Sequence, residues 1–181
     1  MKIQPTEIQG VMVIEPEVFP DARGYFLETY NARDFEKLGI SEQFVQDNQS
    51  QSKRGVLRGL HYQVEQAQGK LIRVLQGEIF DVVVDLRPES GSYGRWSGFR
   101  LSARELKMIW IPKGFAHGFY TLSETADVAY KATEFYAPEH ARVILWNDPD
   151  LAVRWPLLGE PILSDKDQAG HSFREFRKPG P

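Results

Sequence analysis

Short strand-like segments separated by turn residues recur along almost the whole chain. Each is rich in β-branched, aromatic or alternating apolar residues and is bounded by glycine, proline, asparagine or aspartate. Many short strands that do not alternate with helices favour a β-sandwich or barrel over a doubly wound parallel sheet. The predicted strands are residues 11–16, 24–29, 44–50, 56–63, 70–76, 78–86, 95–101, 107–111, 118–122, 127–135 and 143–146.

Helical signal is scarce and lies at the periphery of this pattern. Asn31 is a suitable N-cap for a short helix that runs to Leu38 and stops at Gly39. Ser164 is a second N-cap, before residues 165–169. The sequence therefore predicts an all-β fold with a few short peripheral helices.

The composition is that of an ordinary globular chain. Its 181 residues carry a net charge of −3, so we expect neither a nucleic-acid nor a membrane partner. Cysteine is absent, which excludes disulfides and thiolate chemistry. We find no secretory signal and no membrane-spanning apolar run, and expect one cytoplasmic domain over residues 1–181. The segment after Gln168 is either a dimer-packing segment or a loose tail.

The motif Arg58-Gly-Leu-His61, followed nine residues later by Lys70, places a base and two cations on strands that are predicted to be half-buried. Side-chain parity puts Lys70 and Tyr130 on the more apolar faces of their strands, where a barrel would hold a ligand. An ammonium group there can stabilise an oxygen that gains negative charge, and a phenol can donate a proton. The alternatives are a solvated basic edge strand and a packed aromatic.

Arg58 and His61 are three residues apart, so a regular strand would point them to opposite faces. If both serve one ligand, the backbone needs an irregularity near Gly59, such as a bulge. We therefore predict a break in the ladder at this glycine.

His61 is the candidate general base, because imidazole titrates near neutral pH. Such a base usually has a carboxylate partner that sets its tautomer. Asp81, Asp85 and Asp167 are the candidates, and the residues themselves do not choose between them. The alternative is a hydrogen-bonded core histidine.

The segment Pro112-x-Gly114-x-x-His117 matches the second half of the cupin signature, in which a turn presents a histidine into a small barrel. The first half supplies His-x-His and a glutamate in metal cupins, but here it reads His61-Tyr62-Gln63. Two histidines without a third ligand do not favour a metal site. His117 is otherwise a hydrogen-bonded residue of the turn.

A series of motifs occurs in one order from about Val11 to Asp167. They are Asp21-x-Arg23-Gly-Tyr-Phe26-x-Glu28, Gln46-Asp-Asn48-x-Ser50, Val56-Leu-Arg58-Gly-Leu-His61, Gln68-Gly-Lys70-Leu, Gly77-Glu-Ile-Phe-Asp81-Val, Ile111-Pro-Lys-Gly-Phe-Ala-His117-Gly-Phe119, Tyr130-Lys131, Leu145-Trp-Asn-Asp148-Pro and Leu163-Ser-Asp-Lys166-Asp167. Together they resemble the motifs of the dTDP-4-dehydrorhamnose 3,5-epimerases of the rhamnose pathway.

This resemblance implies a cupin-type jelly roll, an intertwined homodimer and no cofactor. It implies inversion of C3 and C5 of dTDP-4-dehydro-6-deoxy-D-glucose, which gives dTDP-4-dehydro-L-rhamnose. His61 would be the base and Asp167 its partner. Tyr130 would be the acid on the opposite face, and Lys70 would lie near the sugar carbonyl. The implied substrate-binding residues are Arg23, Phe26 and Glu28, acting across the dimer, and Gln46, Asp47, Asn48, Arg58, His117 and Lys166.

One position departs from the family pattern. The family usually has a glutamate of the ligand shell where this chain has Ala141. Its loss should spare proton abstraction but weaken substrate binding or change which carbon is inverted. The alternative activity is therefore a 3- or 5-epimerase of another dTDP-4-keto-deoxyhexose.

Three hypotheses from other classes share the barrel. A metal-dependent cupin oxygenase needs a third ligand. A non-catalytic carbohydrate-binding module has no need for His61 opposite Tyr130. An isomerase of a free keto sugar would not need the cluster from Arg23 to Glu28.

Overall fold

Strands account for most of the regular secondary structure, and the helices are short. A computed structural model describes residues 1–177. The strands are β1 (Lys2–Pro5), β2 (Met12–Glu15), β3 (Val18–Asp21), β4 (Gly24–Leu27), β5 (Gln46–Lys53), β6 (Leu57–Gln63), β7 (Lys70–Gln76), β8 (Glu78–Asp85), β9 (Trp96–Ser102), β10 (Met108–Ile111), β11 (Phe115–Thr121), β12 (Thr125–Ala132) and β13 (Ala141–Val143), and the helices are α1 (Ala32–Lys37), α2 (Asp165–Gln168) and α3 (Phe173–Arg177).

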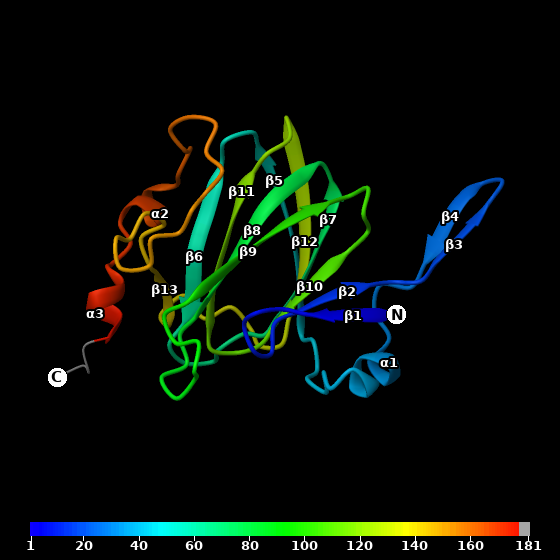
Figure 1. Cartoon of the computed structure of the whole chain (residues 1–181), viewed down its shortest axis with the longest axis horizontal. Coiled ribbons are helices and arrows are strands. Elements are labelled where there is room, and N and C mark those ends of the chain that lie inside the picture. The colour runs from blue at the N-terminus through cyan, green and yellow to red at the C-terminus, as the bar shows by residue number, and fades with distance from the viewer. Residues whose placement is uncertain (178–181) are drawn as a thin grey trace.

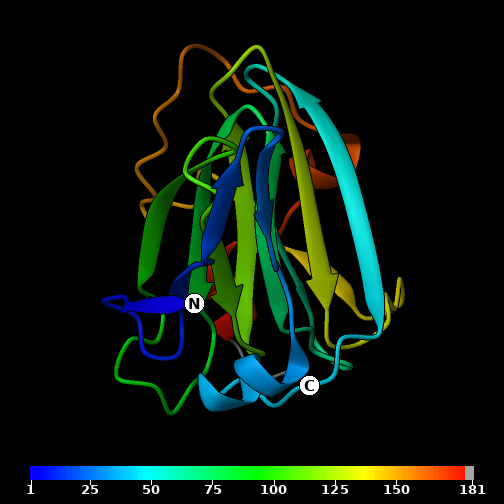
Figure 2. The same ribbon diagram turned by 90° about the vertical axis from the view of Figure 1, so that its right-hand side faces the viewer.

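Two antiparallel sheets face each other in the body of the molecule (Figure 1). One has the strand order β1-β2-β10-β7-β12-β5 and the other the order β13-β6-β11-β8-β9. Strands that are neighbours in a sheet are mostly distant in sequence, as expected for a jelly roll. Figure 2 shows β5 at the free edge of the six-stranded sheet. The predicted all-β jelly-roll fold is confirmed.

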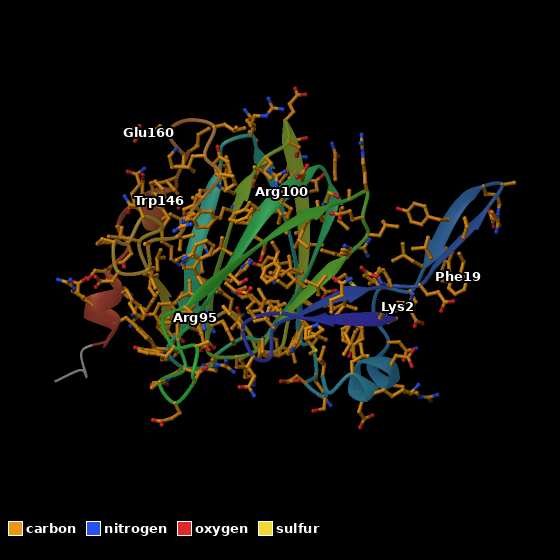
Figure 3. The ribbon with its side chains drawn as sticks, viewed as in Figure 1. Lys2, Phe19, Arg95, Arg100, Trp146 and Glu160 are labelled. Carbon is orange, nitrogen blue, oxygen red and sulfur yellow. The ribbon has the colours of Figure 1, made fainter. Side chains whose placement is uncertain are left out.

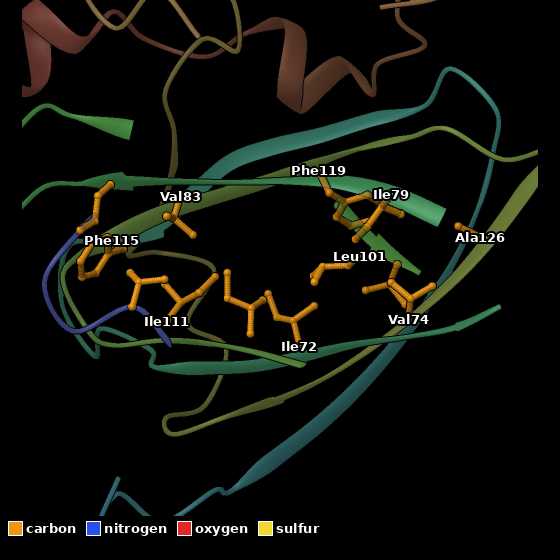
Figure 4. Packing of buried hydrophobic residues seen from close by; sticks show 13 residues of the cluster. Ile72, Val74, Ile79, Val83, Leu101, Ile111, Phe115, Phe119 and Ala126 are labelled. Carbon is orange, nitrogen blue, oxygen red and sulfur yellow. The ribbon is translucent and has the colours of Figure 1, made fainter. Parts of the chain in front are cut away.

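Apolar side chains from the inner faces of both sheets form the central core. Ile72 and Val74 of β7 meet Ile79 and Val83 of β8, and all four are almost fully buried (Figure 4). Residues two apart on a strand share a face, which is why these positions alternate along β7 and β8. Burial of this kind contributes roughly 25 cal/mol per Å² of apolar surface removed from water.

The outer face of the five-stranded sheet is also covered. Val82 and Val84 of β8 point away from the central core, and both are completely buried. They pack in a second cluster with Leu60, Leu151 and Phe173, so the C-terminal part of the chain forms the cover. A strand buried on both faces reads as a continuous apolar run, which explains the valine-rich sequence of β8.

The two predicted N-caps are confirmed. Asn31 accepts a hydrogen bond from the Arg33 amide at the start of α1, and Ser164 accepts one from the Asp167 amide at the start of α2. The helix α3 was not predicted. Its Phe173 packs against Val82 and Val84 of β8, so the alternative of a loose tail after residue 168 is wrong for the described residues. Residues 178–181 lie outside the described residues.

Several strand boundaries differ from the prediction. β1 and β3 were not predicted, because each contains a proline and lies outside the two-sided core. β11 starts at Phe115 and continues through Gly118, which the sequence pattern placed at a strand start. β12 ends at Ala132, and residues 133–135 leave the sheet.

Candidate active site

A cavity of about 240 Å³ opens between the two sheets, and it brings together the four residues to which the resemblance assigned chemistry. His61 enters it from β6 of the five-stranded sheet. Lys70 and Tyr130 enter it from β7 and β12, which are neighbours in the six-stranded sheet. Asp167 comes from α2. The imidazole and the phenol therefore project from opposing sheets into one hollow.

His61 is paired with Asp167. Its Nε2 lies 2.5 Å from Asp167 Oδ1, and the carboxylate is almost completely buried. The other carboxylate oxygen accepts a hydrogen bond of 2.8 Å from the Ser164 hydroxyl. Asp167 is thus the one of the three candidate carboxylates that contacts His61.

The other two candidate carboxylates are engaged elsewhere. Asp81 is fully buried, and its Oδ2 lies 2.7 Å from His117 Nε2. Asp85 accepts hydrogen bonds from the Arg87 guanidinium and from the hydroxyl of Ser90. Neither of them contacts the His61 ring.

The predicted irregularity near Gly59 is confirmed. The pairing of β6 with β11 shifts register between His117, which lies opposite His61, and Phe119, which lies opposite Arg58. Gly59 has a φ of +121°, and a Cβ atom there would lie 2.5 Å from the Cα of Gly118. Only glycine fits this crossing, and the shift lets Arg58 and His61 line the same cavity.

Burial keeps the His61 imidazole deprotonated and the Tyr130 phenol protonated at neutral pH. Burial lowers the pKa of the His61 imidazole, although the hydrogen bond and charge of Asp167 oppose the shift. Burial raises the pKa of the Tyr130 phenol, against the opposing charge of Arg58. At neutral pH the cavity therefore offers a neutral imidazole and a protonated phenol.

The other two residues to which the resemblance assigned chemistry, Asp167 and Lys70, are charged at neutral pH. Burial acts to raise the pKa of Asp167, but the hydrogen bonds from His61 and Ser164 outweigh it and hold the pKa below its usual value. Burial lowers the pKa of the Lys70 ammonium to about 8, with the charge of Asp81 opposing the shift. Lys70 is therefore still mostly cationic at pH 7, and it loses its proton as the pH rises through about 8.

The described cavity wall is rich in positive charge. Arg58, Lys70, Arg142 and Lys166 all line it, against the carboxylate of Asp167. The Arg58 guanidinium is held in place by the Ser52 hydroxyl and by the Gln51 carbonyl, at 3.0 and 3.1 Å. Such a cluster suits a polyanionic ligand in a chain whose net charge of −3 offers no general attraction.

Four other residues implied by the resemblance do not line this cavity. Gln46 donates a hydrogen bond of 2.8 Å to Asn48, and its carbonyl accepts one of 2.9 Å from the amide of Tyr136, a residue that lines the cavity. Asp47 forms an ion pair with Lys131. His117 is bound to Asp81 as described above, so it lies next to His61 without lining the hollow.

Arg23, Phe26 and Glu28 lie apart from this cavity. The first two are on the β3–β4 hairpin, which projects from the side of the body (Figure 1). The side chain of Phe26 is 67% exposed, and Arg23 is paired with Asp21. The structure of one chain therefore does not bring this group to the His61 site.

Sequence reasoning did not single out several residues that line the cavity: Tyr62, Gln63, Gln68, Tyr136, Arg142 and Ser164. Ser164 was recognised only as a helix cap. The alternation along β6 placed Tyr62 on the face away from His61, and Tyr136 lies in an irregular loop without periodicity. Arg142 and Ser164 come from β13 and from the start of α2, so their place at the cavity depends on how these elements dock against β6.

Residues 1–177 contain neither a candidate metal cluster nor a helix that could span a membrane. No group of three His, Asp or Glu side chains in that range is arranged to hold a metal ion. No helix there is long and apolar enough to cross a bilayer.

The sequence is similar to one family of known proteins over almost its full length. Residues 5–175 match the family model described as dTDP-4-dehydrorhamnose 3,5-epimerase. The protein of that name from Pseudomonas aeruginosa is 56% identical over 176 residues, which is 97% of this chain and 97% of that protein. The one from Salmonella typhimurium is 53% identical over 171 residues, or 93% of each chain.

The fold is similar as well. The crystal structure of dTDP-6-deoxy-D-glucose-3,5-epimerase from Legionella pneumophila, in complex with dTDP-4-keto-L-rhamnose, superimposes with a TM-score of 0.92. It is 51% identical and covers 94% of this chain and 92% of its own. The matched region includes every strand that lines the cavity and the helix that carries Asp167. The chain therefore belongs to the dTDP-4-dehydrorhamnose 3,5-epimerase family.

Proposed function

We propose that this protein inverts C3 and C5 of dTDP-4-dehydro-6-deoxy-D-glucose to give dTDP-4-dehydro-L-rhamnose, without a cofactor. The observation that carries the proposal is one cavity into which an imidazole and a phenol project from opposing sheets, beside the half-buried ammonium group of Lys70. Relatives at 53–56% identity bear the name of this activity.

His61 takes the proton from the carbon next to the C4 ketone. With Nε2–H donated to the Asp167 carboxylate, Nδ1 is the ring nitrogen that accepts it. The negative charge of Asp167 then stabilises the imidazolium that forms, as in other base–carboxylate pairs. The lowered pKa of His61 keeps the ring neutral, and therefore basic, before the step.

Tyr130 returns a proton from the opposite face, which inverts the carbon. Between the two transfers the C–H electron pair lies on the enolate, whose oxygen the Lys70 ammonium stabilises. The phenol is still protonated at neutral pH because burial raises its pKa. Solvent then reprotonates the phenolate and removes the proton from His61, so a second carbon can be inverted.

The cations at the cavity mouth bind the diphosphate of the substrate. Arg58 supplies a planar guanidinium that matches phosphate oxygens, and Lys166 supplies a point charge. Lys166 is itself oriented by Tyr136, whose hydroxyl lies 3.3 Å from Nζ. Gln46, which is itself bonded to Asn48, supports this arrangement by accepting a hydrogen bond from the Tyr136 amide.

The test is proton NMR of the 4-keto-6-deoxyglucose nucleotide in heavy water with the purified protein. Deuterium should enter at both C3 and C5 as the L-rhamno product accumulates. The absence of exchange at either carbon would refute the proposal. Prior incubation with free thymidine diphosphate should slow both exchanges, because it competes for the cationic mouth.

Ala141 makes a single-site epimerase the second candidate. It lines the cavity, and it lies opposite Gln63 in the β6–β13 pairing. A methyl group there leaves the cavity wall without the carboxylate that the family usually has at this position. Exchange at only one carbon in the same NMR experiment would establish this second activity.

The pH dependence of turnover should show the titration of Lys70. Because its pKa is lowered to about 8, the ammonium loses its proton as the pH rises through that value, and kcat should fall there. Lys70→Arg keeps the charge at high pH, so its lower activity should no longer decline near pH 8. The matched control is Lys113→Met on the surface, which should keep the wild-type profile. A decline that persists unchanged in Lys70→Arg would contradict the assignment.

We further propose that two copies of the chain form a homodimer through the β3–β4 hairpin. The hairpin, which carries Phe19, extends away from the body (Figure 3). The side chains of Phe19 and Phe26 on it are 51% and 67% exposed. Large apolar side chains on a projecting hairpin favour contact with a second subunit. Light scattering should give twice the mass of one chain, and Phe26→Asp should reduce it. In such a dimer Arg23 and Glu28 would reach the partner's nucleotide.

A further inference from the structure

Two adjacent residues of β6 hold the same C-terminal segment. His61 is hydrogen-bonded to Asp167, and the hydroxyl of Tyr62 lies 2.9 Å from Nε2 of His171. Asp167 and His171 are only four residues apart. Figure 1 shows the helices of this segment, α2 and α3, beside β6 and β13.

The tautomer of His171 follows from its second contact. Its Nδ1 lies 3.0 Å from the backbone carbonyl of Ser172, which can only accept, so Nδ1 carries the proton. In the neutral ring Nε2 is then an acceptor, and the Tyr62 hydroxyl donates to it. Burial raises the pKa of Tyr62 to about 12, so this hydroxyl retains its proton over the working pH range.

The helix that carries Asp167 has little support of its own. α2 spans four residues, and among them only Asp167 is buried. Ser164 holds its start through the N-cap. After its end, His171 is the first residue bound to the sheet, through backbone hydrogen bonds of 3.0 Å with Val143 and Leu145. Before the helix, Ile162 is bound to Gly55 and Leu57 through backbone hydrogen bonds of 2.8 and 3.0 Å, so the position of α2 depends on one anchor before it and on the His171 anchor after it.

The ring of Tyr62 extends the second anchor. It packs edge-on against His171 and Phe176, with centroid distances of 5.9 and 5.4 Å. Phe173, between these two residues, is 4% exposed and belongs to the outer cluster of the five-stranded sheet. The hydrogen bond between Tyr62 and His171 therefore adds to an apolar contact that already holds the chain just after α2.

We propose that Tyr62 and His171 are positioning residues that hold the Asp167 carboxylate against His61. The proposal rests on the proposed function only in its kinetic consequences. Neither residue needs to touch the reacting carbon. If the anchor loosens, the His61–Asp167 contact is made for a smaller fraction of the time, and the base is less well oriented.

The direct test is an NMR titration of the His61 imidazole, which needs no substrate. Asp167 raises the pKa of His61, so loosening the contact should lower that pKa. We expect a lower pKa in Tyr62→Phe and His171→Leu. His171→Gln should remain near wild type, because an amide can still accept from the tyrosine. The control is Tyr93→Phe, which removes a hydroxyl from the same cluster.

The kinetic test measures kcat and KM for the sugar nucleotide. Losing one hydrogen bond should lower kcat by about three- to tenfold in Tyr62→Phe, with KM nearly unchanged. In an Asp167→Asn background the same change should have no further effect, because the positioned carboxylate is already gone. An equal loss of kcat in both backgrounds would overturn the proposal.

The two tests separate the possible failures. If wild-type protein does not turn over the nucleotide, the proposed function fails while the His61 titration still reports on the anchor. If the titration is unchanged in both Tyr62→Phe and His171→Leu, the positioning role is wrong whatever the activity. Should one variant fold poorly by its melting temperature, the other decides the outcome.

Discussion

The variant His61→Asn should lower kcat by roughly 10²–10⁴-fold, the range expected for removal of a positioned general base. Asparagine keeps a hydrogen-bonding group for Asp167, so the carboxylate is not left buried without a partner. Binding of thymidine diphosphate should be little changed, because the cations at the cavity mouth remain. Deuterium exchange at C3 and C5 should be lost together with turnover.

The matched control for this variant is His140→Asn. His140 does not line the cavity, and its ring Nε2 lies 3.6 and 3.9 Å from the carboxylates of Glu65 and Glu139. It should retain wild-type kcat. A non-catalytic binding module would respond differently, since His61→Asn would then weaken sugar binding modestly. Exchange at the wild-type rate in His61→Asn would rule out its role as the base.

The second large effect is expected for Tyr130→Phe, which should separate exchange from inversion. Without the phenol, the rate of inversion should fall by roughly 10²–10⁴-fold, because no acid returns a proton from the opposite face. His61 can still remove the proton and return one from solvent on its own side. Deuterium should therefore enter the substrate with retention of configuration, as followed by NMR and by product analysis.

The appropriate control is again Tyr93→Phe, which removes a hydroxyl outside the cavity. Equal losses of exchange and inversion in Tyr130→Phe would contradict the division of labour between the two faces. Such a result would indicate that the phenol acts before or during proton abstraction, by supporting the enolate next to Lys70.

Most of the strands that could be predicted have at least one buried face. Ile72 and Val74 alternate with outward-facing residues along β7, and the alternation itself placed Lys70 on the inner face. β1 and β3 have no such face, because their side chains are exposed throughout. The hydrophobic pattern reports burial, so strands without burial leave no pattern.

The order of the motifs identified the site residues, and the resemblance paired His61 with Asp167, but the side-chain chemistry alone did not choose that pair. Three carboxylates were equivalent partners for His61 on chemical grounds. Asp167 is 106 residues away along the chain and reaches His61 because α2 docks beside β6. Asp81 lies on β8, which pairs with β11, and its carboxylate binds His117 of β11 instead. Long-range pairing of this kind depends on which elements are adjacent in space.

The amino-acid sequence by itself determined the class of fold, the inward faces of β7 and β12, and the glycine at which β6 must break its ladder. These features follow from the alternation of side chains and from local backbone geometry, which act within a few residues. Side-chain chemistry left three carboxylates as equal partners of His61, and the tertiary structure shows that Asp167 makes the contact, which cations share the cavity, and how Tyr62 and His171 hold the segment that carries Asp167. Those contacts join residues that are distant along the chain, and only the packing of the two sheets and their covering helices brings them within hydrogen-bonding distance.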